Sequence, residues 1–383
     1  MIVRAITLFY NPPSWDVGSI TSDLSSILKE YTEVLARKLD KPLLKGGKRL
    51  SFPMLPGDMI EKVSIPYLIR KIEEIACGNG VDFVANLHIS EDNIGNIKID
   101  DVAKVLTKTK ASFISYNINL KSDRKDIDRV IDSYIQLLRI SISQGFWKEL
   151  ARVALALNGP ILSPYYPVSV NTMKSNGIAI AALYTDLFKK TLLKKTVDVI
   201  DYIAKYFKLY NEIGKTIANT LNVEYFGFDF SLSPWMEYSV VEIVEKFMNG
   251  KELGDHGTLH TIYYLNMMLW RAAEKANIKK VGYCELMLPV AEDNILKLRV
   301  AKGKVKTKDL ISYTIVCVAG LDMIYFPMED LKYVKPIIED LIAICEVKKR
   351  SIGIRLIPTS ARPFEVIHTD EFGGVPVMSL TSR

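Results

Sequence analysis

Several common sequence features are missing from this chain of 383 residues. Its four cysteines, Cys77, Cys284, Cys317 and Cys345, are scattered without a close pair. This spacing argues against a zinc site or a redox motif and favours buried thiols. The N-terminus lacks the shape of a signal peptide, and no apolar run reaches the length of a membrane span. We therefore expect a cytoplasmic protein that does not contact a membrane.

A strongly basic surface is also missing. The net charge is +6, and the lysines and arginines are spread over short clusters without aromatic residues between them. Such clusters are typical of solvated faces, so we expect no nucleic-acid partner. Glutamine is scarce, with Gln136 and Gln144 alone, while lysine and isoleucine are plentiful. This bias suggests the hypothesis of a thermophilic source.

The motifs of several large enzyme classes are absent. Gly214, Lys215 and Thr216 resemble the end of a phosphate-binding loop, but residue 209 is leucine where the first glycine would stand. Neither a G-x-S-x-G elbow nor an H-E-x-x-H sequence occurs. These absences argue against a P-loop ATPase, a serine hydrolase and a zincin. No complete dinucleotide-binding fingerprint is present either.

What the chain does contain is a regular alternation of β-rich and helical runs. Nearly half of its residues are hydrophobic, so a sizeable core can form. We expect strands at residues 2–10, 50–54, 81–88, 112–118, 225–230, 282–288, 322–326 and 352–357. We expect helices at 19–39, 67–76, 99–106, 126–143, 191–221, 239–248, 258–275, 308–315 and 331–345. No shift in composition divides the chain, so the pattern predicts one α/β domain over residues 1–383, shaped as a closed or nearly closed β/α barrel.

Three further segments complete the pattern, and two of them have more than one interpretation. Residues 147–157 read as a continued helix, and residues 177–187 fit either a buried helix or a buried strand. The loop 162–167 (LSPYYP) is either packing at a turn or one wall of a pocket. The helices at 126–143 and 191–221 carry more apolar surface than one barrel wall needs, which predicts a homodimer or a larger symmetric oligomer.

Polar residues follow several of the predicted strands, at the end where β/α proteins bind their ligands. Asp229, Ser231, Ser233, Glu292 and Asp293 follow strands, whereas Asp322 begins the strand at 322–326, Arg355 lies within the strand at 352–357 and Glu371 lies in a late turn. We expect Asp229, Glu292 and Asp293 to act as acid–base or ligand groups, and the others to bind a small-molecule ligand. The plain alternative is that Asp229 and Asp293 only cap helices.

A second polar group surrounds the start of the helix at 258–275. His256 and His260 are four residues apart, so on a helix they share a face and could ligate a divalent metal. His256 is also a candidate acid–base group. The backbone N–H groups of Gly257 and Thr258 could bind an anion, although Asp255 argues against a strongly anionic ligand. The alternative is that His256 caps the helix and His260 lies at the surface.

The C-terminal half resembles a known family in several ordered blocks. The blocks are residues 227–234 (GFDFSLSP), 257–258 (GT), 288–293 (LPVAED), 320–324 (GLDMI), 355–358 (RLIP), 371–374 (EFGG) and 376–378 (PVM). They are similar to those of the uncharacterised family DUF711, also called UPF0210. The opening residues 3–7 also resemble the first strand of that family. The similarity is strong over residues 223–380 and loose in the middle of the chain.

The resemblance implies a ten-stranded β/α barrel of the pyruvate formate-lyase and ribonucleotide reductase type. It does not imply radical chemistry, because no glycyl-radical motif occurs near the C-terminus and no cysteines are adjacent. The family is encoded in many genomes beside a small ACT-domain protein, which makes such a protein a candidate partner and suggests a link to amino-acid metabolism. His256 stands where bacterial relatives have an apolar residue or proline, and this departure weakens any anion site carried over from them.

Two functional hypotheses remain open from the sequence. The first is a non-radical enzyme that acts on a small polar metabolite at the barrel mouth. The second is a non-catalytic ligand-binding or regulatory protein linked to amino-acid metabolism. An enzyme should gather several titratable groups with shifted pKa values around one pocket, whereas a regulator should expose a large apolar face to its partner.

Overall fold

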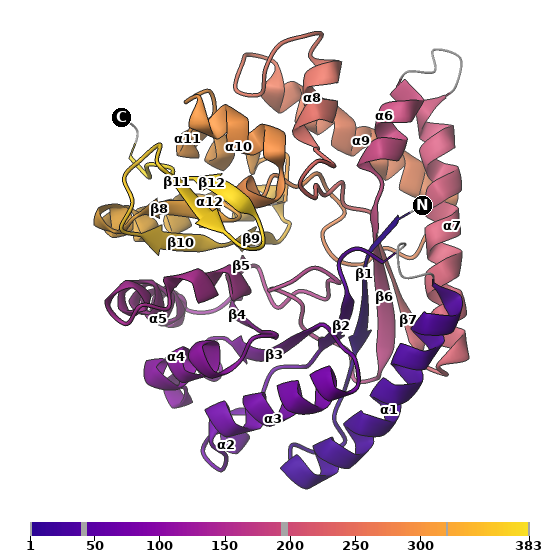
Figure 1. Ribbon diagram of the computed structural model, residues 1–383, viewed down its shortest axis with the longest axis vertical. Helices are drawn as coiled ribbons and strands as arrows, with labels where there is room; N and C mark the ends of the chain where they lie inside the picture. The colour runs from indigo at the N-terminus through magenta and orange to yellow at the C-terminus, as the bar shows by residue number, and fades with distance from the viewer. Residues whose placement is uncertain (1, 40–43, 193–197, 319–320, 382–383) are drawn as a thin grey trace.

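The centre of the protein is a curled sheet of eight strands, seen in the computed structural model of the chain (Figure 1). The structure describes residues 2–39, 44–192, 198–318 and 321–381. Gly320 and part of the helix expected at 191–221 (residues 193–197) lie outside the described residues. The strand order in the sheet is β7-β6-β1-β2-β3-β4-β5-β9. The α/β class predicted from the sequence is therefore confirmed.

The eight strands run in two opposite directions. Their bounds are β1 (Ile2–Phe9), β2 (Lys48–Ser51), β3 (Phe83–Ile89), β4 (Ser112–Ile118), β5 (Val153–Leu157), β6 (Gly177–Leu183), β7 (Glu224–Asp229) and β9 (Ile352–Ile354). Strands β1 to β5 are parallel to one another. Strand β6 pairs antiparallel with β1 and carries β7 beside it in parallel, and β9 pairs antiparallel with β5. Each edge of the β1–β5 group is thus flanked by strands of the opposite direction.

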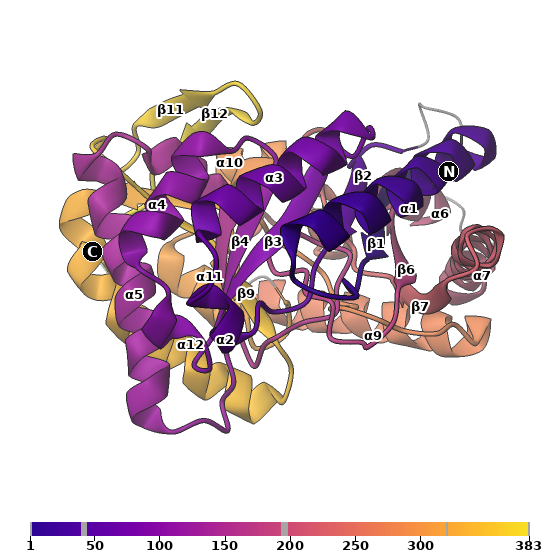
Figure 2. The same ribbon diagram turned by 90° about the horizontal axis from the view of Figure 1, so that it is seen from below.

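Helices cover the outside of the curl. The α-helices are α1 (Val17–Lys38), α2 (Gly57–Ile60), α3 (Ile65–Gly78), α4 (Ile99–Lys108), α5 (Arg124–Ser143), α6 (Thr185–Leu192), α7 (Val199–Thr220), α8 (Val241–Phe247), α9 (Thr258–Ala276), α10 (Asn294–Ala301), α11 (Thr307–Tyr313) and α12 (Val334–Lys348). Helices α1, α3, α4 and α5 lie side by side along the outer face of the parallel strands (Figure 2). Because both faces of the sheet are covered, strands β1, β5 and β6 are mostly apolar and almost fully buried.

Short helical turns and two small sheets complete the C-terminal half. The 3-10 turns are η2 (Ile94–Asn96), η3 (Trp147–Arg152), η4 (Val290–Glu292) and η5 (Met328–Tyr333). Strand β8 (Ile324–Pro327) pairs in parallel with β10 (Leu356–Thr359), and β11 (Val366–Thr369) forms a hairpin with β12 (Gly373–Pro376). The largest sheet of the described residues is thus a curled sheet of eight strands and not a closed barrel of ten. One hydrophobic core cluster includes residues from Val3 to Leu380.

Two predicted elements are wrong, each for a local reason. The predicted helix at 147–157 is a short 3-10 turn followed by β5, which lies between β4 and β9. The sequence of β5, VALAL, is a short apolar run that occurs in both helices and strands. Its position between two strands of the sheet favours the strand. The predicted strand at 282–288 is irregular, because Gly282 and Cys284 have positive φ angles of 76° and 60° that a β ladder does not accommodate.

The buried segment at 177–187, for which the sequence left two readings, forms strand β6 up to Leu183. Before it, residues 158–176 cross the face of the sheet that the outer helices leave uncovered. The Pro164 carbonyl accepts hydrogen bonds from Thr7 Oγ1 and Arg49 Nη1, both at 3.1 Å. The Ser169 carbonyl accepts another from Ser51 Oγ at 2.8 Å. These bonds hold the loop against β1 and β2, inside the curl. Among the described residues, no helix is long and apolar enough to cross a membrane.

Candidate functional site

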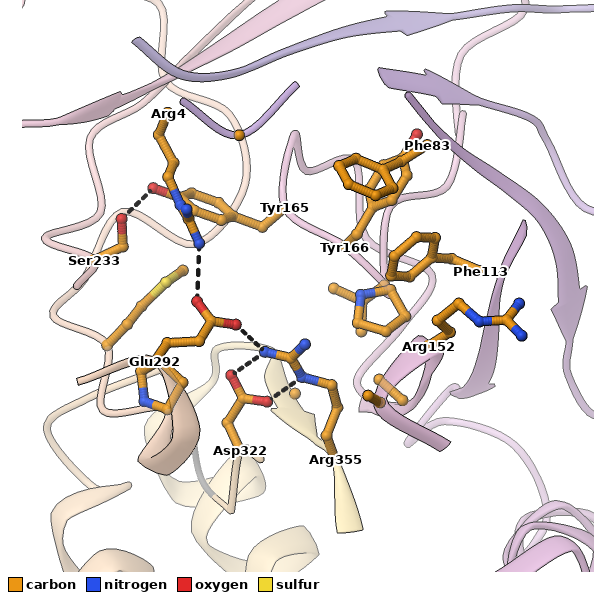
Figure 3. Close-up of a pocket in the computed structure, with 18 of the residues that line it drawn as sticks. Arg4, Phe83, Phe113, Arg152, Tyr165, Tyr166, Ser233, Glu292, Asp322 and Arg355 are labelled. Carbon is orange, nitrogen blue, oxygen red and sulfur yellow. Dashed lines mark hydrogen bonds and ion pairs between the residues drawn. The ribbon is translucent and has the colours of Figure 1, made fainter. Parts of the chain in front are cut away.

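A pocket lies between the parallel strands and the C-terminal half of the chain (Figure 3). Its volume is about 180 Å³, many times the space that one water molecule needs. Arg4, Arg49, Phe83 and Phe113 reach it from the amino ends of β1 to β4. The other wall comes from segments that follow β7 and β9. Because β6 is antiparallel to β1, the carboxyl ends of one group of strands meet the amino ends of the other here.

Four charged side chains form a continuous chain along one wall of the pocket. Arg4 Nη2 donates to Glu292 Oε2 at 2.8 Å, and Arg355 Nη2 donates to Glu292 Oε1 at 2.9 Å. Arg355 also binds Asp322 through both Nε and Nη2. Figure 3 shows the sequence Arg4, Glu292, Arg355 and Asp322 joined in this order. Such bidentate and charge-assisted bonds fix the orientation of these groups.

The pKa values of Glu292 and Asp322 are shifted in opposite directions. Burial alone would raise the pKa of Glu292, but Arg355 and Arg4 hold it below its ordinary value. Burial raises the pKa of Asp322, and Arg355 only partly opposes the shift. Glu292 is therefore ionised at neutral pH and is occupied by two guanidinium groups.

Arg4 keeps unused hydrogen-bonding capacity. Its guanidinium carbon lies 4.1 Å from the centroid of the Trp235 ring, and the side chain is almost fully buried. Within the described residues, its Nε and Nη1 atoms have no hydrogen-bond partner. Buried donors of a charged group are rarely left in this state, because each lost bond costs about 1–3 kcal/mol.

Arg49 is the second cation of the pocket. Its Nε donates to the Gly46 carbonyl at 3.0 Å, and its guanidinium group packs beside the Tyr166 ring, 5.0 Å from the centroid. Burial, followed by repulsion from Arg4, lowers the pKa of Arg49 to about 10. Arg49 therefore remains charged at neutral pH. An anion bound between Arg49 and Arg4 would reduce the electrostatic repulsion of the two guanidinium groups.

The wall opposite the charges is aromatic. The Phe113 ring packs edge-on against both Phe83 and Tyr166, with centroids 5.6 Å and 5.1 Å apart. Tyr165 lies deeper, and its hydroxyl shares a 3.0 Å hydrogen bond with Ser233 Oγ. The LSPYYP loop thus supplies three residues of the pocket wall, Tyr165, Tyr166 and Pro167, which is one of the two roles that its sequence left open.

Glu371 lies at the rim of the pocket, in the turn of the β11–β12 hairpin. It is exposed, and among the described residues its carboxylate makes no hydrogen bond or ion pair. Its pKa is raised, first by loss of surrounding water and then by the negative charge of Glu292. The next residue, Phe372, packs edge-on against Trp235, and its carbonyl accepts a 2.7 Å bond from Lys297 Nζ. These contacts hold the hairpin over the pocket.

The structure brings five of the sequence-predicted site residues to this pocket. They are Ser233, Glu292, Asp322, Arg355 and Glu371. All five come from the second half of the chain. There the carboxyl ends of β7 and β9 point towards the pocket, so residues after these strands can reach it.

The structure does not bring Asp229 and Asp293 to the pocket. Asp229 is fully buried, and its carboxylate accepts from the backbone N–H groups of Ser231, Tyr283 and Cys284 at 2.9–3.0 Å. Ser231 Oγ also donates to Asp229, at 2.6 Å. Burial raises the pKa of Asp229 despite these bonds. Asp229 and Ser231 therefore hold the 282–284 turn together instead of facing a ligand.

Asp293 connects the starts of two helices. Its Oδ1 accepts from the N–H groups of Ile295 and Leu296 in α10, and its Oδ2 accepts from Val240 and Val241 at the start of α8. Burial raises its pKa as well. All four of these bonds come from backbone N–H groups at helix starts. Asp293 therefore caps helices, as the alternative interpretation of the sequence has it.

His256 and His260 are both exposed and lie outside the pocket, as do Gly257 and Thr258. Thr258 Oγ1 donates to the Asp255 carbonyl at 2.8 Å and closes the turn before α9. Within the described residues, no three histidine, cysteine or acidic side chains are grouped so that they could hold a metal ion. The expectation that Asp229, His256 and Asp293 share one cavity is therefore wrong. These residues are each held by a separate local turn.

Sequence reasoning missed Arg4 and Arg49. Arg4 lies in the mostly apolar strand β1 and Arg49 in the short strand β2, and both are buried. A charged residue inside a buried strand is costly unless it is paired, so this pattern was the available signal. The rule that ligand groups follow strands does not single out Arg4 and Arg49, because both lie near the beginnings of their strands.

Comparison with known proteins agrees with the blocks seen in the sequence. The model of the family described as "Uncharacterised ACR (DUF711)" matches residues 2–363. The chain belongs to this family. A UPF0210 protein of Sulfurisphaera tokodaii is 24% identical over an alignment that covers 97% of this chain and 88% of the relative. A UPF0210 protein of Methanosarcina mazei is 25% identical, with 82% of this chain and 74% of the relative covered.

A UPF0210 protein of Methanococcoides burtonii is more similar over a shorter region, with 32% identity across 44% of this chain and 38% of the relative. The family description and the names of these relatives state no activity. Functional inference therefore depends on the pocket itself.

Proposed function

We propose that the pocket binds a small organic anion with a flat or apolar body, and that the protein acts on it as a non-radical enzyme. The observation that carries this proposal is the guanidinium group of Arg4: the residue lines the pocket, and within the described residues its Nε and Nη1 atoms are buried without a hydrogen-bond partner. A carboxylate or phosphate oxygen is the natural acceptor for such donors. Arg49 adds a second positive charge to the same pocket.

The charges of the pocket support an anionic ligand. Glu292 is shared between Arg4 and Arg355, and Asp322 is bound to Arg355. Arg152 also lines the pocket, but its guanidinium group is occupied by Glu149 and by three backbone carbonyls. The charges of Arg4 and Arg49 are therefore compensated only in part. The aromatic wall of Phe83, Phe113 and Tyr166 offers the apolar surface on which the body of the ligand would lie.

Glu371 supports a catalytic role over binding alone. The pKa of Glu371 is raised above the ordinary value of a glutamate, which moves its proton transfer in the direction of neutral pH, and Glu371 lies at the rim of the same pocket. Its carboxylate is free to approach the ligand. In this scheme Arg4 and Arg49 bind the anionic group, and Glu371 transfers a proton at the other end of the ligand.

The proposal is tested first by binding. Thermal unfolding would be followed with inorganic phosphate, with aliphatic mono- and dicarboxylates and with aromatic carboxylates, each beside its neutral amide or ester. We expect at least one anion to raise the unfolding temperature, because a ligand at 100 times its Kd stabilises the folded state by about 2.7 kcal/mol. The neutral analogue should have no effect. If no anion of the panel stabilises the protein, the proposed ligand class is wrong.

Two variants separate binding from catalysis. Arg49→Met should weaken binding of the stabilising anion at least tenfold in calorimetry, whereas Arg37→Met, at an exposed position of α1, should leave it unchanged. Glu371→Gln should bind the anion with nearly the same Kd but lose turnover. An anion that binds without ever being converted would instead favour the non-catalytic, ligand-binding alternative.

We further propose that irregular segments close the curled sheet into the barrel that the family resemblance implies. Backbone hydrogen bonds continue beyond β7, from Phe228 to Lys279 and from Leu232 to Glu285 and Met287. Further bonds join Val318 to Leu286, and Leu321 and Ile324 to Arg355, next to β9. These bonds support a ring of segments around the 158–176 loop. Hydrogen exchange should then show slow exchange at the N–H groups of Met287 and Val318, as slow as in β1.

A further inference from the structure

Helix α9 presents an unusual surface on the outside of the protein. Four of the large hydrophobic side chains that are exposed in the described residues lie on it: Leu259, Tyr263, Tyr264 and Met267, with 36–51% of their surface exposed. The opposite face of α9 is buried against the rest of the protein, mainly α7 and α8. Figure 2 shows α9 along the outer edge of the molecule. Apolar side chains gathered on one exposed helix face are a mark of an interaction site.

The exposed residues of α9 form a seam with helical spacing. His260, Tyr263, Met267, Arg271 and Glu274 are all exposed and follow one another at intervals of three or four residues. This is the spacing of a helix face that packs against another helix. Within the described part of the chain, the side chains of Arg271 and Glu274 make no ion pair, so both are available to a partner.

The seam is complementary to itself when it is reversed about Met267. Residues equally far before and after Met267 face each other if two α9 helices pack antiparallel around a two-fold axis. His260 then meets Glu274 of a second copy, and Tyr263 meets Arg271. Each opposed pair matches a positive or proton-donating group with a negative or π-electron-rich one. Both pairs are repeated by the symmetry, and the two Met267 side chains meet on the axis.

We propose that the partner of this surface is a second copy of the chain, docked through an antiparallel α9 pair centred on Met267. The sequence predicts a homo-oligomer through the helices at 126–143 and 191–221, which correspond to α5 and α7. On α5 the apolar side chains are buried or partly buried, and on α7 Leu209 stands as an isolated exposed side chain. Those helices use their apolar faces within one chain, whereas α9 carries exposed apolar side chains on its outer face as well.

Cysteine cross-linking tests the register of the pair. In a Cys77→Ser background, which removes the one cysteine of the four that is exposed, Met267→Cys places a thiol on the proposed axis. Mild oxidation should convert most of this variant to a disulfide-linked dimer on a non-reducing gel. Leu209→Cys, at an equally exposed position of α7, should remain uncross-linked at the same protein concentration. Equal cross-linking of the two variants would overturn the proposal.

A mixing experiment sharpens the same test. Tyr263→Cys and Arg271→Cys chains should cross-link with each other when mixed, and each alone should not, because two copies of residue 263 would lie about 12 Å apart along the helix axis. A parallel pair would give the reverse pattern and would overturn the proposal.

Sedimentation measures the association without a cross-link. Wild-type protein should sediment as a dimer at micromolar concentration, and Met267→Glu, which sets two carboxylates against each other on the axis, should raise the dimer Kd at least tenfold. Leu209→Glu should leave the dimer intact. A wild-type monomer at tens of micromolar, or a dimer that Met267→Glu does not weaken, would refute the interface.

Discussion

Arg4 and Glu292 are 288 positions apart in the chain, and Arg4 Nη2 donates to Glu292 Oε2 at 2.8 Å in a buried ion pair. This contact joins the first strand to the turn before α10. Through Arg355 it continues to Asp322, so that one carboxylate balances two guanidinium groups. The positions of the charges in the pocket therefore depend on one another, and a change at Glu292 affects both sides.

The first prediction concerns the stability of this chain of charges. Glu292→Gln removes the carboxylate and leaves Arg4 and Arg355 buried with less compensation. Breaking a buried pair from one side costs about 3–5 kcal/mol, and we expect a loss of that order in the free energy of unfolding by urea. Glu339→Gln is the matched control, because Glu339 pairs with Arg124 at the surface and exposed pairs contribute about 0–1 kcal/mol. Equal losses in the two variants would contradict the assignment.

The second prediction concerns Asp229, which belongs to the GFDFSLSP block. Asp229→Ala would leave the N–H groups of Tyr283 and Cys284 buried without an acceptor. Each such group costs about 1–3 kcal/mol, so we expect a loss of several kcal/mol in urea unfolding. Asp198→Ala removes an exposed cap of α7 and should cost about 1 kcal/mol. A loss at Asp229 no larger than at Asp198 would show that the turn does not depend on its carboxylate.

The contrast between Asp229 and Glu292 shows what the sequence can predict about the site. Asp229 is the last residue of β7, Glu292 comes after the irregular segment 282–288, and the sequence predicts that both face a ligand. Glu292 lines the pocket, but Asp229 is turned towards the 282–284 backbone. The difference depends on the positive φ angles of Gly282 and Cys284, which direct two N–H groups at Asp229. A polar residue at a strand end predicts a buried polar contact, and the three-dimensional path of the next loop decides whether the partner is backbone or ligand.

The fold was predictable where periodicity is local. The helix at 258–275 and the strand at 112–118 agree closely with α9 and β4. The antiparallel pairing of β1 with β6 was not predictable, because it joins residues 168 to 181 positions apart. That pairing turns the amino ends of β1 and β2 towards the pocket, and so it decides that Arg4 and Arg49 take part in the site.

The third prediction concerns the domain organisation, for which the sequence suggested a single domain over residues 1–383. The core cluster contains residues from both ends of the chain, and Arg4 is bonded to Glu292 across it. We therefore expect circular dichroism and tryptophan fluorescence to report one coincident unfolding transition in urea. The region around the partly buried Trp235 and the helices of the N-terminal half should lose structure together. Two separated transitions would indicate two domains.

The last prediction concerns His88, a fully buried residue of β3 whose Nδ1 atom lies 2.8 Å from Ser115 Oγ. Within the described residues its Nε2 atom is buried without a partner. Burial lowers the pKa of His88 from 6.5 to about 4. The folded protein therefore keeps His88 neutral in a range where the unfolded chain takes up a proton, so the stability of the fold should fall as the pH drops from about 6.5 to about 4.

The size of this effect follows from the shift, at about 1.4 kcal/mol for each pKa unit, or about 3 kcal/mol across the whole range. The measurement is urea unfolding between pH 7 and pH 5, above the range in which most carboxylates titrate. His88→Gln should remove most of the dependence on pH in this interval, whatever its own effect on stability. His256→Gln, at an exposed position, should retain it. If the slope against pH is the same in His88→Gln as in the wild type, another group must be responsible, and His88 is not held neutral by the fold.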